Sequence, residues 1–434
     1  MAVGPVMTAQ RRPIASALPP YVVAVRWSRA NLFSSFGNSV LTIVMVALIG
    51  FAGYQGARFV FATAEWEIIE ANRGLLFTGR FPRDEFWRIW MALHGVAVLA
   101  GFSWRIWGSL SPRLPLIFAA ACVPLYILML EGDALILTST SIVTFAAAYF
   151  AAWPVRLSRF RDRARSVTVW LWIIGFAAVM LPTALYPSFL PGQGGLFSHV
   201  PDREWGGLLL TMILATVGIG VAFPLGVLLA IGRASTFPVI RIFCVAYIEL
   251  IRAVPLVTIL FMSFFILRLA IKHPTSPIPT FFFGSIDIGI PITGYEMSVV
   301  SMAMLGLIIF SAAYIAEIVR GGLQAVPRGQ VEAGQALGLG GLQVLALIVL
   351  PQALRAVIPA LVSQFISLFK DTSLVFILAL TDLLAVYKIA PSQPGFIGHH
   401  TEVLLFIGLV YWVIAFSMSR ASQQLESSLG VGER

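Results

Sequence analysis

The sequence predicts an all-α membrane protein that crosses the bilayer many times. Of its 434 residues, 59% are hydrophobic and only 11% are charged, and the mean hydropathy is +0.89. Soluble domains are about half apolar and about a quarter charged, so a soluble protein of this composition could not cover its surface with polar groups. The apolar residues fall in continuous runs rather than in alternation, which favours helices over a transmembrane barrel. A soluble enzyme is therefore excluded.

The apolar runs predict ten membrane-spanning helices, because about 20 mostly apolar residues are enough to cross a bilayer. The first five runs occupy residues 39–63, 89–108, 114–130, 134–153 and 167–186. The second five occupy residues 207–231, 242–267, 295–319, 356–380 and 403–419. The third run is short and the ninth contains charged residues.

The charge distribution predicts that both ends of the chain lie in the cytoplasm. Residues 1–38 carry four arginines and lack the apolar core and cleavage site of a signal peptide. We therefore expect a cytoplasmic tail followed by a retained anchor, with residues 421–434 as a second cytoplasmic tail. This topology places most of the 29 Lys and Arg residues on the cytoplasmic side, as the positive-inside rule requires. The net charge of +9 is thus interpreted as a topology signal and not as a nucleic-acid-binding surface.

The longest expected cytoplasmic loop of the second half, residues 320–355, predicts a compact elbow. The stretch between Gly329 and Gly338 favours a short helix. A second helical run follows, and we expect it to stop at Pro351, which cannot donate a backbone hydrogen bond. Two short helices joined at a glycine could transmit force between a soluble partner and the adjoining spans.

The spacing in this loop resembles the EAA loop of ABC-importer permeases. The matching positions are Glu332, Ala333, Gly334, Gly338, Ile348, Leu350 and Pro351. Gly334 departs from the family pattern, which usually has a second alanine there. The resemblance implies that residues 332–338 form a coupling helix that sits in a groove of a cytoplasmic ATPase. The alternative is an amphipathic surface loop in an unrelated transporter.

Three further segments resemble the polar-amino-acid-uptake permeases. They are Tyr314-x2-Glu317-Ile-Val-Arg320, Glu249-Leu-Ile-Arg252 and Phe369-Lys-Asp-Thr-Ser-Leu374. These permeases usually have five spans, and the five extra leading spans resemble the longer subunit of the general L-amino acid permease. The resemblance implies a type I ABC-importer permease core at 207–420, preceded by an extension of about five transmembrane helices at 39–206.

The resemblance also implies the partners. We expect a multi-pass subunit of the bacterial inner membrane that carries L-amino acids from periplasm to cytoplasm by alternating access. A second homologous permease, a homodimeric ABC ATPase and a periplasmic amino-acid-binding protein would complete the importer. The three lysines follow Ile271, Phe369 and Tyr387, so the chain has no Gly-Lys pair for a phosphate-binding loop. ATP and Mg would therefore bind the partner, and we expect no cofactor, metal or catalytic residue in this chain.

Two groups of polar residues inside the spans are candidates for the translocation path, because ionisable groups there are costly. Glu249 and Arg252 are three residues apart and could neutralise each other. Arg252 could instead face the substrate, or the pair could position a kink at Pro255. A polar stripe on the ninth span should face a cavity or a neighbouring helix at the permease interface. Its members are Ser363, Gln364, Ser367, Lys370 and Asp371.

Two other classes of membrane protein fit the sequence less well. An ion-driven secondary transporter often shows repeated halves with broken helices, but residues 1–206 and 207–434 have no convincing similarity. A polytopic enzyme would need a cluster of His, Asp or Glu near one face, and the carboxylates within the spans are few and scattered.

Overall fold

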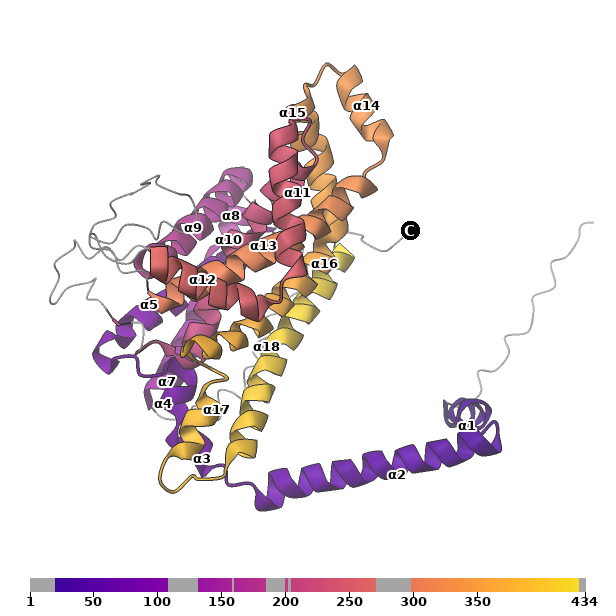
Figure 1. Ribbon diagram of the computed structural model, residues 1–434, viewed down its shortest axis with the longest axis vertical. Coiled ribbons are helices and arrows are strands. Elements are labelled where there is room, and N and C mark those ends of the chain that lie inside the picture. The colour runs from indigo at the N-terminus through magenta and orange to yellow at the C-terminus, as the bar shows by residue number, and fades with distance from the viewer. Residues whose placement is uncertain are drawn as a thin grey trace, which may run out of the picture. The chain divides into compact units, whose positions relative to one another are not determined.

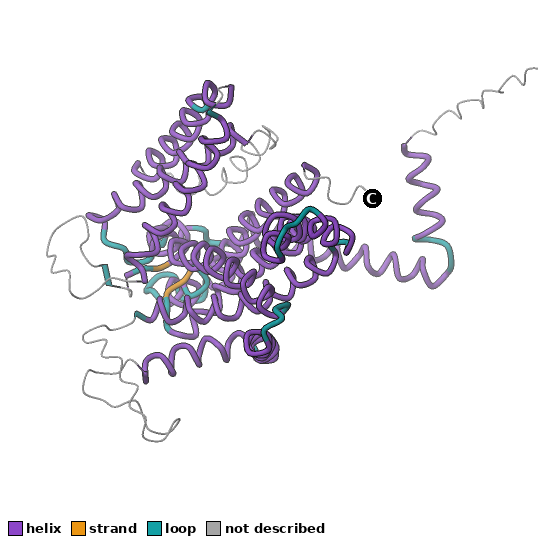
Figure 2. Tube along the Cα trace, turned by 90° about the horizontal axis from the view of Figure 1, so that it is seen from above, coloured by secondary structure: helices purple, strands orange, loops and turns teal. Residues whose placement is uncertain are grey.

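The computed structural model is almost entirely helical in the part of the chain that it describes (Figures 1 and 2). The described residues are 20–107, 132–157, 160–184, 200–201, 204–270 and 298–428. The chain divides into two compact units, Met1–Glu65 and Trp66–Arg434. Within the described residues, six helices are long and apolar enough to cross a membrane, or seven if a bent pair counts as one span.

The first unit contains one apolar helix of membrane-spanning length. It comprises α1 (Pro20–Asn31), α2 (Phe36–Arg58) and the π-helical turn η1 (Phe59–Thr63). Ser35 begins α2, because its hydroxyl accepts a hydrogen bond from the Asn38 backbone N–H at 3.2 Å. No residue of α2 is buried. An apolar helix that is exposed all round is suited to lipid, as predicted for residues 39–63.

The second unit begins with short helices and a small bundle. Its elements are α3 (Glu67–Ala71), α4 (Arg73–Thr78), η2 (Arg83–Glu85), α5 (Phe86–Trp107), α7 (Gly132–Ala151), α8 (Trp153–Leu157) and α9 (Arg161–Ala184). Helix α5 packs against α7 and α9. These three helices lie where spans 89–108, 134–153 and 167–186 were predicted. The span predicted at 114–130 lies outside the described residues.

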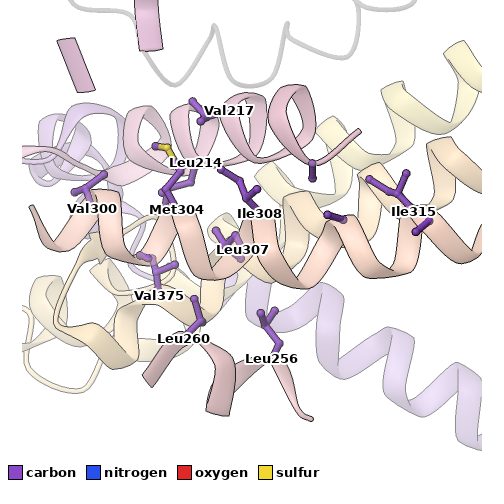
Figure 3. Close-up of a cluster of buried hydrophobic side chains, with 14 of the residues drawn as sticks. Leu214, Val217, Leu256, Leu260, Val300, Met304, Leu307, Ile308, Ile315 and Val375 are labelled. Carbon is purple, nitrogen blue, oxygen red and sulfur yellow. The ribbon is translucent and has the colours of Figure 1, made fainter. Parts of the chain in front are cut away.

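The rest of the second unit is a helical core built around α13. The long helices are α10 (Gly207–Arg233), α11 (Pro238–Ala253), α12 (Leu256–Ala270), α13 (Val299–Ala325), α16 (Leu350–Asp371) and α18 (His400–Ser428). Helix α13 is the most buried of the described spans. Figure 3 shows Leu214 of α10 and Leu260 of α12 on opposite sides of α13, both in contact with one buried cluster.

The seventh predicted span, residues 242–267, is broken rather than continuous. Helices α11 and α12 meet at an angle of 112°. Pro255 has no backbone N–H, and it restricts the residue before it to an extended conformation. Val254 adopts that conformation, with φ −106° and ψ 135°. The single prolyl residue therefore turns one apolar segment into two helices.

The prediction that the second helix of the elbow stops at Pro351 was wrong. Helix α15 (Gly341–Val344) continues through the π-helical turn η4 (Leu345–Val349) into α16. Pro351 lies in the first turn of α16, where a missing N–H is tolerated. The wide π-helical turn before it changes the hydrogen-bond register, so the chain passes the proline without ending the helix.

Residues 66–82, which lie between the first two predicted spans, contribute to a second hydrophobic cluster. Ile68, Ile69 and Leu76 of α3 and α4 pack with residues of α17 (Val386–Ile389) and α18. The strand β1 (Thr381–Asp382) lies beside the start of α10 through bridges to Gly206 and Gly207, and Gly79 forms a further bridge to Trp205. This N-terminal segment is therefore attached to the end of the core at which α10 begins. The 3-10 turns η5 (Thr372–Leu378) and η6 (Ala390–Ser392) lie, together with β1 and α17, between α16 and α18 in the chain.

Adjacent glycines near the end of α13 provide a test of its packing. A Cβ added to Gly322 would lie 2.6 Å from the Ala353 carbonyl oxygen of α16, whereas one added to Gly321 would meet nothing within 4 Å. We expect Gly322→Ala to lower the free energy of unfolding by about 1–3 kcal/mol, because backbone would have to move. Gly321→Ala should leave it unchanged or raise it by up to about 1 kcal/mol through helix propensity. Thermal unfolding in detergent measures both, and equal effects would contradict the packing.

Candidate functional site

The elbow consists of α14 (Arg328–Ala336), a sharp turn at Gly338 and the α15–η4 segment (Figure 1). Gly338 has φ +82°, a left-handed conformation that favours glycine. Its N–H donates to the Gln335 carbonyl at 2.9 Å, and the Leu339 N–H donates to the Gly334 carbonyl at 3.2 Å. This pair of hydrogen bonds is a Schellman motif, which satisfies carbonyls at the end of α14. The Gly338 turn was therefore predicted correctly from the sequence.

Gly334 and Ile348 hold the two arms of the elbow together. Gly334 is buried, and a Cβ at this position would lie 2.7 Å from Cδ1 of Ile348 and 3.1 Å from Cγ2 of Val344. The Gln352 side chain also links the arms, because its Nε2 contacts Gln330 Oε1 of α14 at 3.4 Å. The same Nε2 donates to the Ile348 carbonyl of its own arm at 2.9 Å. The glycine at 334, where the motif usually has alanine, thus allows the closest packing between the arms.

The elbow exposes three leucines on its outer surface. Leu337 and Leu342 are 81% and 82% exposed, and Leu347 is 67% exposed. Glu332 and Ala333 are also exposed. Apolar side chains in a solvent-facing loop are characteristic of a contact surface for another protein.

Behind the elbow, five charged residues from α10, α11 and α13 form one cluster centred on Glu317. Arg233 Nη1 lies 3.3 Å from Glu317 Oε2 and 3.1 Å from Glu249 Oε1. Arg320 Nε donates to Glu317 Oε1 at 3.0 Å, and Arg252 Nη1 lies 3.7 Å from Glu317 Oε2. Three arginines therefore share two carboxylates, which ties together three helices just before the elbow.

The expected pairing of Glu249 with Arg252 was wrong. Each residue instead pairs across helices: Glu249 with Arg233 of α10, and Arg252 with Glu317 of α13. Arg252 also lies over the Tyr314 ring, 5.6 Å from its centre. A spacing of three in sequence places two side chains on one helix face, but neighbouring helices offered both residues other partners. No pattern in the sequence places Arg233 in this cluster.

The polar stripe of α16 lies on surface that this chain leaves partly uncovered. Ser363, Ser367 and Lys370 are exposed, and Gln364 and Asp371 are half-buried. Ser363 donates to the Pro359 carbonyl of its own helix at 3.0 Å. Lys370 and Ser373 line a cavity of about 220 Å³ between α16 and α18, together with Tyr411.

The charge cluster generates a stability prediction with a matched control. Glu317→Gln would leave three arginines facing one carboxylate, so we expect the free energy of unfolding to fall by about 1–2 kcal/mol. The effect is smaller than at a fully buried site, because these side chains are partly exposed to solvent. Glu332→Gln removes the same charge from an exposed site and should change it by less than about 0.5 kcal/mol. Thermal unfolding at low and high salt measures both. Equal effects of the two substitutions would show that the cluster does not stabilise the core.

Comparison with known proteins assigns this architecture to a family. Residues 222–431 match the family described as "Binding-protein-dependent transport system inner membrane component". The chain is 36% identical over 427 residues to the "Inner membrane amino-acid ABC transporter permease protein YhdY" of Escherichia coli, with 94% of each chain covered. It is 32% identical over 442 residues to the "Glutamate/glutamine/aspartate/asparagine transport system permease protein BztC" of Rhodobacter capsulatus, again with 94% of each covered.

A shorter relative separates the core from the extension. The "Probable glutamine ABC transporter permease protein GlnP" of Bacillus subtilis is 33% identical over 222 residues, which is 51% of this chain and 91% of that protein. This shorter relative therefore matches about half of the chain, whereas the two long relatives above match 94% of it. The chain belongs to the family of binding-protein-dependent transport system inner membrane components, as a long-form ABC transporter permease of the inner membrane.

Proposed function

We propose that the chain imports L-amino acids as one of two permeases in an ATP-driven importer. A periplasmic binding protein would deliver the substrate, and a homodimeric ATPase on the cytoplasmic side would supply energy and bind ATP and Mg. The names of the long relatives support an amino-acid substrate. The observation that carries the proposal is the elbow, which exposes three leucines and is joined directly to core helices.

The elbow is suited to receive a mechanical input. Its arms are closed on each other by Gly334 and Ile348, so a force on α14 would move the whole elbow rather than open it. Exposed Leu337 and Leu342 would be buried in a groove of the ATPase. A contact of this kind shifts an equilibrium only if closed ATPase subunits bind one state of the permease more tightly than the other.

The charge cluster supports transmission from the elbow to the path. Helix α13 leads into the elbow, and Glu317 and Arg320 lie in its last turns. Through Arg233 and Arg252, the same cluster reaches α10 and the end of α11, beside the 112° bend. Movement of α13 would therefore act on the broken helix pair. Ion pairs can exchange partners without loss of all contacts, so the three helices could move between two arrangements while the cluster persists.

The elbow would lie on the cytoplasmic side, together with both chain termini. Helices α10 and α13 approach each other through Arg233 and Glu317 near their C-terminal ends. The excess of Lys and Arg in the segments expected on this side supports the orientation. The opposite side would then carry the α3–α4 and α17 segments and receive the binding protein.

Ser363, Gln364, Ser367, Lys370 and Asp371 remain candidates for the half-path contributed by this chain. Their partial exposure fits a surface that faces either substrate or the second permease. Substitution of Gln364 by Glu distinguishes the two. A change in the preferred amino acid would favour a path position, and loss of the permease pair would favour an interface.

Leu337→Glu tests the proposed contact with the ATPase. The chain would be co-expressed with its partner subunits, purified as a complex and reconstituted in proteoliposomes loaded with ATP. A charge in an apolar contact costs desolvation, so we expect uptake of radiolabelled glutamine to fall at least tenfold, with loss of the ATPase from the complex. Leu337→Met keeps the surface apolar and should keep more than half of the uptake.

The same proteoliposomes discriminate against an ion-driven carrier. Uptake should require internal ATP and should persist when sodium and proton gradients are collapsed by ionophores. Uptake that follows an ion gradient and ignores ATP would overturn the proposal, as would full transport by the Leu337→Glu complex.

A further inference from the structure

An arginine at the end of α5 lies over two aromatic rings, and no carboxylate in the described part of the chain pairs with it. The Arg105 guanidinium carbon lies 3.7 Å from the centre of the Trp153 ring and 5.0 Å from that of Tyr149. Its Nη1 also donates to the Tyr149 hydroxyl at 3.0 Å. The two rings come from α8 and the last turn of α7, so three helices fix the position of one cation.

Among the described residues, only the Tyr149 hydroxyl accepts a hydrogen bond from Arg105. A guanidinium has five N–H donors, and the bond to Tyr149 uses one of them. Its Nε is buried and has no partner among the described residues, and the same is true of the adjacent Trp104 Nε1. The described carboxylates form no ion pair with Arg105. A fixed cation at a membrane edge, with a buried donor that no described residue satisfies, is suited to bind an anion from outside the chain.

The segment of the chain that follows Trp153 is strongly basic. Residues 156–165 contain five arginines and one acidic residue, Asp162. Asp162 is paired with Arg165 at 3.1 Å, which leaves no carboxylate in this segment for the other arginines. Trp153 and Trp170 are 50% and 62% exposed, as aromatic residues at a membrane interface commonly are. Positive charge among interfacial aromatics attracts anionic lipid headgroups.

Arg105 lies on the same side of the membrane as the elbow. Helix α5 begins close to the start of α10, where the Phe81 and Trp205 rings are 6.3 Å apart. Both helices are of spanning length, so both emerge on the opposite side. There α10 ends at Arg233, which contacts Glu317 before the elbow.

We propose that Arg105, with Tyr149 and Trp153, binds the phosphodiester headgroup of an anionic phospholipid. The planar guanidinium matches two phosphate oxygens, and the rings hold that plane in place so that little side-chain entropy is lost on binding. The acyl chains would lie along the apolar surfaces of α5 and α7. The extension would thereby anchor the permease in one leaflet, independently of transport.

The test measures lipid retention by the purified full-length chain. Native mass spectrometry would follow binding of dioleoylphosphatidylglycerol, with dioleoylphosphatidylcholine as the zwitterionic lipid. We expect Arg105→Gln to weaken phosphatidylglycerol binding about fivefold, the equivalent of about 1 kcal/mol for one basic residue near an anionic surface. Trp153→Leu keeps every charge and should also weaken binding, because it removes half of the aromatic support. Arg105→Lys should bind at an intermediate level.

Arg420→Gln is the matched control. Like Arg105, Arg420 lies over an aromatic ring, but only over one, that of Phe416, at 4.9 Å. Arg420 is exposed and donates a hydrogen bond to Gln423. Its substitution should leave lipid retention unchanged. Equal loss with Arg420→Gln would show general surface attraction and would overturn the site. Equal binding of phosphatidylcholine, or displacement of the lipid by millimolar inorganic phosphate, would also overturn it.

Discussion

The burial of α13 between α10, α12 and α16 is the contact on which the rest of the structure depends. In a membrane, apolar side chains gain little by leaving lipid, so helix association relies on close packing. Small residues make that packing possible. A Cβ at Gly226 of α10 would meet the side chain of Ile315, and one at Gly322 would meet the backbone of α16. The position of α13 then determines where its charged end and the elbow lie.

The charge cluster follows from that position. Glu317 on α13 reaches arginines of α10 and α11 only because the helices are already close. The bend at Pro255 brings the end of α11 into the same place, and the elbow begins directly after α13. This chain therefore has a continuous set of contacts from the exposed leucines of the elbow to a broken membrane helix. The Arg105 site belongs to the extension and does not depend on that set.

Periodicity and motif spacing were sufficient for most of the helices and for the turn at Gly338, because these depend on local composition and on one glycine. They were insufficient where distant segments meet. Glu249 and Arg252 were assigned to each other since sequence shows only the shared helix face, whereas their partners lie on α10 and α13. Pro351 was expected to end a helix, but the π-helical turn before it absorbs the proline. The burial of α3 and α4 against α17 and α18 could not be predicted, because the segment that contains α3 and α4 is rich in charged residues.

We propose that a partner ATPase drives the core through the exposed surface of the elbow. Site-specific cross-linking measures this contact. A photo-reactive amino acid would replace Leu337, which is 81% exposed, and separately Phe61 of the first unit, which is 88% exposed. After irradiation of membranes that contain the assembled importer, mass spectrometry would identify each adduct. We expect a P-loop ATPase attached at position 337 and no ATPase at position 61. An importer that transports normally but yields no ATPase adduct at position 337 would contradict it.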